Sequence, residues 1–324
     1  MCGIAGYLGA QPRNVLGRMA GAMSHRGPDG EGFWSADGVG LAHRRLAIID
    51  CTEEAAQPMV SCDGRYHVVF NGEIYNFRQF EPELRRRGYV FNPRSDTAIL
   101  GPMFDAYGPA MLHRLNGIFA FAIWDSTEKS LFVARDGLGI KPLYYGVPRQ
   151  GLVFASEMKA VLQADGIDRT IDHAALRDYL VHLWSPGERT MLKGVRKLLP
   201  GHYLLTGPDR QPTFHRWYRA QAAQPRAAEA MPSPGQSPGA RPEALLALLD
   251  QVVADQCLSD VPIGAFLSGG VDSTAVVASM LATGNRPAAT YCVGQMGGGF
   301  EDDHAGLRVE RRTAEADGDG DGLR

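Results

Sequence analysis

A segment with few large apolar side chains divides this chain into two parts of different character. Residues 216–242 are rich in Pro, Ala and Gly, and a segment with so little apolar surface to bury is typical of a linker. The part before it carries many short apolar runs, and the part after it shows a strand, helix and strand pattern. The 324 residues leave room for about two domains. We therefore expect two domains of different fold class.

The first part, residues 2–215, is predicted to be an α+β domain. Apolar residues at helical spacing predict helices at 77–87 and 97–107, and Gly88 would end the first of them. Short runs of β-branched, aromatic or other apolar residues predict strands at 38–50, 65–70, 118–124, 130–134 and 151–154. Sheets that are covered by helices indicate a layered sandwich.

The second part, residues 243–304, is predicted to begin a parallel α/β domain. Its apolar patterns predict a helix, a strand, a helix and a strand at 243–257, 262–267, 274–281 and 288–293. A strand, helix and strand in succession is the opening of a parallel sheet. Only 51 residues follow Ser273, whereas a parallel sheet with its covering helices would need on the order of 100 to 200 to be completed. We therefore expect an incomplete domain.

The last residues have a different composition. After about His304 the apolar periodicity is lost and the chain ends in an Asp-Gly repeat, so 305–324 is expected to be an aberrant, disordered tail. A frameshift or premature stop in the coding sequence would explain the change. A flexible acidic tail on a shorter working protein is the alternative.

Composition narrows the classes of partner. A net charge of -3 provides no basic surface for nucleic acid. No apolar run approaches the roughly 20 residues of a membrane span, and the start lacks the pattern of a secretory signal. Five cysteines without a CxxC pair indicate a reducing compartment and no zinc site. We expect a cytoplasmic protein with no nucleic acid, membrane or protein-bound metal partner.

Cys2 is the first candidate for chemistry. Removal of Met1 would place its thiol beside a free α-amine, whose ordinary pKa of about 7.7 allows it to accept a proton near neutral pH. Nucleophile and base would then belong to one residue. The alternative is that Cys2 is a small buried hydrophobe.

Other polar groups of the first part each have two interpretations. Arg45 could bind a carboxylate through two hydrogen bonds, or be the solvated end of a strand. Asn71 and Gly72 could hold an oxyanion, or form a type I′ hairpin turn. Asp96 could bind a substrate ammonium, or cap the helix after it. The loop at 24–30 carries His and Arg where a plain turn needs neither.

In the second part, the sequence LSGGVDS at 267–273 lies between a predicted strand and a predicted helix. Its glycines let backbone N–H groups approach an anion at the start of the helix, and its serines add hydroxyl donors. It lacks the lysine of a Walker loop. The pattern predicts a phosphate-binding loop, and a purely structural turn is the alternative.

Six motifs in order, MCGI, HRGPDG, LAHRRLAIID, FNGEIYN, RSDT and ARDGLGIKPLYY, resemble the glutamine amidotransferase domain of glutamine-hydrolysing asparagine synthetases. The likeness covers residues 2 to about 165 and resumes at 259–273. It implies a four-layer αββα sandwich of the N-terminal-nucleophile hydrolase type, followed by the start of an ATP-pyrophosphatase-type domain with a parallel sheet.

The resemblance implies roles for residues of the first domain. Cys2 would attack the side-chain amide of glutamine, release ammonia and form a thioester, with its own amine as base. Asn71 and Gly72 would form the oxyanion hole. Residues 135–142 and 155–159 would serve architecture and domain contact. The implied glutamine-binding residues are Arg45 for the α-carboxylate, Asp96 for the α-ammonium, and Leu46, Ala47, Ile48, Ile49, Asn71, Gly72 and Glu73.

For the second domain the resemblance implies ATP as cosubstrate, accompanied by Mg²⁺, whereas the glutaminase half would need no cofactor. Aspartate would be activated as aspartyl adenylate, and ammonia travelling inside the protein would convert it to asparagine with release of AMP, after pyrophosphate has left. A homodimer is left open. The implied ATP-binding residues are Leu267, Ser268, Gly269, Gly270, Asp272, Ser273 and Val293.

Three functions follow as hypotheses. The first is a glutamine-hydrolysing asparagine synthetase, of which this chain is expected to retain only the glutaminase activity. The second is an amidotransferase of the same group that acts on another carboxylate acceptor. The third is a non-catalytic protein that binds glutamine.

Overall fold

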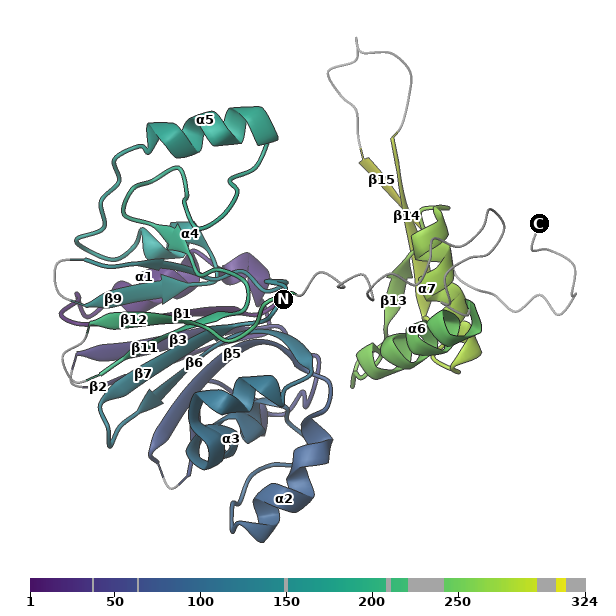
Figure 1. Cartoon of the computed structure of the whole chain (residues 1–324), viewed down its shortest axis with the longest axis horizontal. Coiled ribbons are helices and arrows are strands. Elements are labelled where there is room, and N and C mark those ends of the chain that lie inside the picture. Colours follow the sequence, from purple (N-terminus) through teal and green to yellow (C-terminus); the bar gives the residue numbers. More distant parts are fainter. Residues whose placement is uncertain are drawn as a thin grey trace, which may run out of the picture. The chain divides into compact units, whose positions relative to one another are not determined.

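The computed structural model describes residues 1–36, 38–62, 64–148, 151–207, 211–220, 242–295 and 307–312. The chain divides into two compact units, Met1–Ala223 and Gln224–Arg324 (Figure 1). This division falls within the segment expected as a linker. Trp217, however, donates its indole N–H to the Arg135 carbonyl at 3.1 Å, so the linker begins later than residue 216. Residues 221–241 lie outside the described residues.

The first unit contains two six-stranded sheets in which every neighbouring pair is antiparallel. The strands of one sheet, in spatial order, are β10 (Arg196–Lys197), β8 (Tyr144–Gly146), β9 (Leu152–Ala155), β1 (Gly3–Leu8), β3 (Val39–Arg45) and β2 (Gly30–Ala36). Those of the other are β12 (Pro212–Arg216), β11 (His202–Thr206), β7 (Ser130–Arg135), β6 (Gly117–Asp125), β5 (Tyr66–Ile74) and β4 (Met59–Ser61).

The main core lies between these two sheets. Ile4 and Leu8 of β1 join Val69 of β5 and Val133 of β7, and each is at most 1% exposed. Because side chains alternate across a strand, Ala5 and Tyr7 of β1 face the other way, outward from this core. Both belong to a second buried cluster.

Helices cover the outer faces of the sheets. That second cluster includes residues of α1 (Val15–Gly21) and α4 (Met158–Val161), which pack on the sheet of β1. On the opposite side lie α2 (Glu81–Arg86) and α3 (Leu100–Tyr107) (Figure 1). The result is the four-layer αββα sandwich that was predicted. The remaining helices of this unit are α5 (His173–His182) and the 3₁₀ helices η1 (Ser24–Arg26), η2 (Glu53–Ala55), η3 (Phe77–Phe80), η4 (Thr97–Ile99) and η5 (Gly108–His113).

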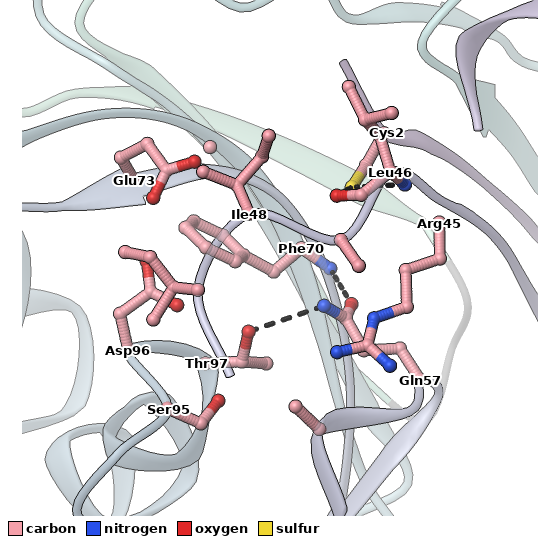
Figure 2. A pocket seen from close by; sticks show the side chains of 14 residues that line it. Cys2, Arg45, Leu46, Ile48, Gln57, Phe70, Glu73, Ser95, Asp96 and Thr97 are labelled. Atoms are coloured by element: carbon pink, nitrogen blue, oxygen red, sulfur yellow. Dashed lines mark hydrogen bonds between the residues drawn. The ribbon is translucent and has the colours of Figure 1, made fainter. Parts of the chain in front are cut away.

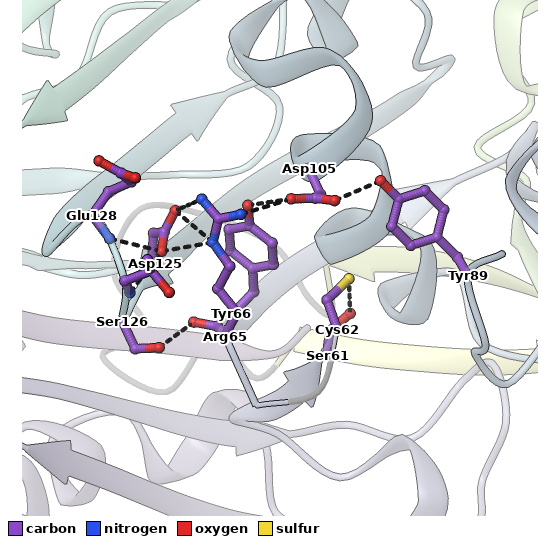
Figure 3. Close-up of polar contacts among 10 residues, drawn as sticks. Ser61, Cys62, Arg65, Tyr66, Tyr89, Asp105, Asp125, Ser126 and Glu128 are labelled. Carbon is purple, nitrogen blue, oxygen red and sulfur yellow. Dashed lines mark hydrogen bonds and ion pairs between the residues drawn. The ribbon is translucent and has the colours of Figure 1, made fainter. Parts of the chain in front are cut away.

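Polar contacts fasten α3 to the sheet (Figure 3). Asp105 of α3 accepts hydrogen bonds from the Arg65 guanidinium at 3.0 Å and from the Tyr66 hydroxyl at 2.8 Å, both at the start of β5. Asp96 immediately precedes η4, which leads directly into α3. The anchor at Asp105 therefore helps to fix the position of Asp96 relative to β5.

Several elements differ from those predicted. The expected strand 65–70 continues to Ile74 as β5, so Asn71 and Gly72 lie inside a strand and the hairpin alternative is wrong. The expected strand 38–50 ends at Arg45. The two helices predicted in this part each divide into a 3₁₀ helix and a short α-helix. Strand propensity does not predict where β3 and β5 end, because the pairing partners in the sheet decide this.

The second unit has the predicted order of elements. Helix α6 (Pro242–Gln256) is followed by β13 (Gly264–Phe266), α7 (Val271–Ala282) and β14 (Ala289–Gln295). Strands β13 and β14 pair in parallel.

Part of the expected tail is ordered as a strand. β15 (Leu307–Arg312) pairs antiparallel with β14, so the prediction of disorder is wrong for these residues. The first four residues of this segment, LRVE, alternate between apolar and polar, and the backbone of β14 offers an edge to pair with. The rest of 305–324 lies outside the described residues. In the part of the chain that is described, no helix has both the length and the apolar character to span a bilayer.

Candidate active site

A pocket of the first unit collects nearly all the residues predicted to bind glutamine (Figure 2). Its walls come from the start of β1, the chain after β3, the loop around residue 56, β5 and the turn before η4. The lining residues are Cys2, Arg45, Leu46, Ala47, Ile48, Ile49, Ala55, Gln57, Phe70, Gly72, Glu73, Ser95, Asp96 and Thr97. The cavity volume is about 40 Å³, little more than one water occupies.

Cys2 lies at one end of the pocket, held by β1 immediately behind it. Its sulfur faces the backbone of Leu46, with the Leu46 N–H at 3.4 Å and the carbonyl at 3.5 Å. Burial raises the pKa of the Cys2 thiol, although the Leu46 backbone and the chain terminus oppose the shift. A thiol in this state needs a base to become a nucleophile at neutral pH. Burial lowers the pKa of the nearby α-amine of Met1.

Arg26, which was not assigned to the site, holds the backbone of Cys2 and is itself held by Glu157. Arg26 donates from Nε to the Cys2 carbonyl at 2.9 Å and from NH1 to the Glu157 carboxylate at 3.0 Å. Arg26 lies in the loop 24–30, which the sequence singles out for its His and Arg, and Glu157 lies in the segment 155–159 that was expected to be architectural. Only the tertiary structure brings them to Cys2. Lys141, expected to be architectural, is also close: it is 9% exposed, and its charge lowers the pKa of Cys2 and of Glu73.

Asn71 lies on β5 between Phe70 and Gly72 and is 1% exposed, but unlike these two neighbours it does not line the pocket. No acceptor for its side-chain Nδ2 lies among the described residues. A buried amide donor without an acceptor costs about 1–3 kcal/mol. A buried donor without an acceptor does not stabilise the fold. Its presence here fits a donor that forms its hydrogen bond with a bound ligand.

Gly72, next to Asn71, turns its N–H away from β6. Phe119 stands opposite Gly72 but exchanges its own N–H and carbonyl with Asp136 on its other side. The two residues are therefore a non-hydrogen-bonded pair, in which the N–H of Gly72 points outward from the ladder. A Cβ at Gly72 would stand 2.2 Å from the Ile118 carbonyl, so only glycine fits here. The outward side is where Gly72 lines the pocket.

Arg45 is the last residue of β3 and forms part of the pocket wall, where it is half-buried. Its guanidinium donates to the Thr52 carbonyl at 2.7 Å and to the Asp50 carbonyl. The alternative was that Arg45 is a solvated strand end. It does not hold, because the chain after β3 folds back and places two carbonyl groups against the guanidinium. Neutral carbonyls are weak partners for a guanidinium, and a carboxylate would bind it more strongly.

Asp96 and Glu73 form an acidic wall opposite Cys2. Asp96 is 4% exposed and accepts the Ile74 backbone N–H at 3.0 Å, and it makes no capping hydrogen bond to η4. Burial raises the pKa of Asp96 to about 6. Burial and the charge of Asp96 raise the pKa of Glu73 to about 8, although Lys141 opposes this. A cationic group placed between the two carboxyls would be bound by both.

Glu73 should make the stability of the protein depend on pH. A carboxyl whose pKa is raised by folding contributes its full stability below its unfolded pKa, and this contribution is lost as the pH rises through the folded pKa. For Glu73 this window runs from 4.5 to about 8. Because a glutamine side chain cannot ionise, the melting temperature of Glu73→Gln should fall by several degrees less across this window than that of the unchanged protein. A loss of 1 kcal/mol of stability corresponds to about 2–4 °C.

The measurement is the melting temperature at a series of pH values across that window. Glu53→Gln, at an exposed carboxyl, is the control and should keep the slope of the unchanged protein. An equal slope for Glu73→Gln would contradict the assignment of a buried neutral carboxyl.

The phosphate-loop candidate of the second unit has the predicted strand, turn and helix form. Gly269 has φ of +82°, a conformation that favours glycine. The Ser273 hydroxyl lies 3.0 Å from that of Ser268 and 3.2 Å from the Ser268 N–H. Leu267, Gly270 and Asp272 complete the turn and the first turn of α7. Val293 lies in the neighbouring strand β14.

These donors fit an anion: hydroxyl and N–H groups gather at the start of a helix of 12 residues, where the helix dipole favours negative charge. Among the residues that the structure describes, no group of three or more His, Cys, Asp or Glu side chains could hold a metal ion.

Known proteins resemble both parts of the chain. The model of the glutamine amidotransferase domain family matches residues 1–218, and that of the asparagine synthase family matches 244–316. The chain is 35% identical over 323 residues to asparagine synthetase (glutamine-hydrolyzing) 1 of Bacillus subtilis, covering 98% of this chain and 49% of that protein. It is 35% identical over 256 residues to amidase chry2 of Gibberella zeae, covering 78% of this chain and 37% of that protein.

The chain thus spans about half the length, or less, of these curated relatives. Glutamine phosphoribosylpyrophosphate amidotransferase from B. subtilis has a similar solved structure, with a TM-score of 0.51 at 18% identity over 88% of this chain and 65% of that chain. This likeness concerns the fold. From the match to its first unit, the chain belongs to the glutamine amidotransferase domain family.

Proposed function

We propose that the first unit hydrolyses glutamine to glutamate and ammonia, with Cys2 as nucleophile after removal of Met1. The observation that carries this proposal is the pocket itself. It combines a thiol, a guanidinium, two carboxyls and an outward backbone N–H from segments far apart in the sequence. An amino acid with a side-chain amide has complementary groups for each of them.

The chemistry proceeds in two halves. The α-amine of Cys2 takes the thiol proton, the sulfur bonds to the amide carbon of glutamine, and the carbonyl oxygen becomes an oxyanion. Asn71 Nδ2 and the Gly72 N–H donate to that oxygen. The amine then gives the proton to the leaving nitrogen, and ammonia departs as a thioester forms. Water cleaves the thioester to glutamate and restores the thiol.

The charges of the pocket would orient the substrate. Arg45 would exchange its contacts with the loop carbonyls for the α-carboxylate, which is the stronger partner. Asp96 and Glu73 would bind the α-ammonium, and its positive charge would lower the pKa of both carboxyls. Leu46, Ala47, Ile48 and Ile49 would close over the aliphatic part. Such positioning holds the amide carbon within reach of the sulfur.

For the second unit we propose that the loop 267–273 binds the phosphates of ATP, with Val293 beside the nucleotide. Mg²⁺ would accompany the triphosphate and neutralise part of its charge. Aspartate would be activated on its β-carboxylate, and ammonia would displace AMP to give asparagine. The match to the asparagine synthase family and the name of the B. subtilis relative support this acceptor.

A second candidate is transfer of ammonia to another carboxylate acceptor. The likeness to the Gibberella zeae amidase, over 78% of this chain, supports this second candidate. The glutamine half of the chemistry would be the same, and only the acceptor would differ.

The test is to incubate the full chain with glutamine in the absence of ATP and to measure glutamate and ammonia. We expect equal amounts of the two products. A protein that binds glutamine without releasing ammonia would be the non-catalytic alternative. Addition of ATP and aspartate, with assays for asparagine and pyrophosphate, then distinguishes aspartate from other acceptors.

A further inference from the structure

Gln57 is a pocket residue that makes contacts to two opposite walls. Its Oε1 accepts the backbone N–H of Phe70 on β5 at 2.6 Å, and its Nε2 donates to the Thr97 hydroxyl of η4 at 3.2 Å. Both hydrogen bonds are drawn in Figure 2. They connect segments 13 and 40 residues away from Gln57 in the sequence.

The first contact fixes one edge of β5. In an antiparallel strand, N–H groups of alternate residues point to the same side, so those of Phe70, Gly72 and Ile74 all point outward from β6. β4 covers this edge only as far as Val68, which pairs with Met59. Beyond Val68, β4 no longer pairs with β5, and side chains accept N–H groups of β5 instead.

Two side chains accept the outer N–H groups and leave the middle one to the pocket. Gln57 accepts from Phe70, and Asp96 accepts from Ile74 at 3.0 Å. Gly72, between them, lines the pocket. The acceptors on either side therefore set the direction in which the Gly72 N–H points.

The second contact closes these interactions into a ring. Thr97, 4% exposed, follows Asp96 directly, so the bond from Gln57 to Thr97 ties the Asp96 turn back to the acceptor of Phe70. The ring runs from Gln57 to β5, along β5 to Asp96, and through Thr97 back to Gln57. Gly72 lies on the β5 segment of this ring, between the two fixed N–H groups.

The backbone of Gln57 is itself fixed from outside the ring. A Cβ on Gly32 of β2 would stand 2.0 Å from the Gln57 carbonyl oxygen. β2 therefore lies directly against this carbonyl, so the backbone that carries the Gln57 side chain is held in place.

We propose that Gln57 is a positioning residue for glutamine hydrolysis, which fixes the Gly72 N–H for the oxyanion and, through Thr97, the Asp96 carboxylate for the α-ammonium. This inference rests on the proposed function. It predicts that Gln57 controls both the rate of the chemical step and the selectivity for substrates with an α-amino group.

The experiment compares glutamine with glutaramate, which is glutamine without its α-amino group, as substrates of the full chain. The variants are Gln57→Met, which keeps the length of the side chain but forms neither hydrogen bond, and Thr97→Val, which removes only the second. Thr190→Val is the matched control, because Thr190 is 5% exposed and its hydroxyl donates to the Val195 carbonyl at 2.7 Å, outside the pocket.

Loss of one such hydrogen bond corresponds to about a fivefold change. Thr97→Val should lower the ratio of kcat/KM for glutamine to that for glutaramate about fivefold, with a smaller effect on kcat for glutaramate than that of Gln57→Met. Gln57→Met should lower this ratio to a similar extent and also lower kcat for both substrates about fivefold or more. The double variant should show the ratio of Gln57→Met alone, since both changes break the same bond. Thr190→Val should keep the ratio.

The inference is overturned if the unchanged chain hydrolyses glutamine but Thr97→Val and Gln57→Met keep its ratio, or if Thr190→Val lowers the ratio as much. Because Thr97→Val is isosteric, it remains informative even if Gln57→Met does not fold. A chain that releases no ammonia from glutamine would overturn the proposed function, and this inference with it.

Discussion

Replacement of Cys2 with alanine should reduce glutamine hydrolysis by more than about a thousandfold, because no other thiol of the described chain lines the pocket. The measurement is glutamate released per enzyme, together with the yield of a covalent adduct between the protein and a glutamine analogue that carries a reactive group on its side chain. Both should vanish in Cys2→Ala. Binding of glutamine should remain, since the Arg45 and Asp96 contacts are retained.

Cys62→Ala is the matched control, because Cys62 is also a half-buried thiol but does not line the pocket. It should hydrolyse glutamine at the normal rate. Persistent hydrolysis in Cys2→Ala would place the nucleophile elsewhere. Mass spectrometry of the purified protein gives a second check: the active fraction should equal the fraction from which Met1 has been removed, since a preceding residue would convert the basic amine into an amide.

Replacement of Asn71 with alanine should lower kcat about 100-fold or more with a much smaller change in KM, as expected for a donor that acts on the developing oxyanion. The same change should leave the melting temperature nearly unaltered, because Asn71 Nδ2 has no acceptor to lose among the described residues. Loss of activity without loss of stability separates a role in the transition state from a role in the fold.

Asn76→Ala is the opposite case and serves as the control. The Asn76 side chain donates to the Arg114 carbonyl at 3.0 Å and accepts the Asn116 N–H at 2.9 Å. Its removal should lower the melting temperature, because two hydrogen bonds are lost, while kcat stays normal. An Asn71→Ala variant that is strongly destabilised, or that keeps its kcat, would contradict the assignment of Asn71 to the oxyanion hole.

The second unit illustrates where local pattern is sufficient. A buried strand, a glycine-containing turn and an apolar helix follow one another without interruption, so β13, the loop 267–273 and α7 could be predicted from consecutive residues. The ordering of 307–312 could not, because β15 exists through pairing with β14, and so short a segment has no preferred partner until an edge is available.

In the first unit, side-chain patterns predicted an α+β sandwich and a nucleophile candidate. The likeness of motifs that are continuous in the chain implied the four αββα layers and most of the residues that meet in the pocket. Tertiary structure decided the rest. The outward direction of the Gly72 N–H depends on its register against Phe119, and the contacts of Gln57, Arg26 and Lys141 join segments far apart in the chain. Register and long-range packing are set by the whole sheet, so no window of sequence contains them.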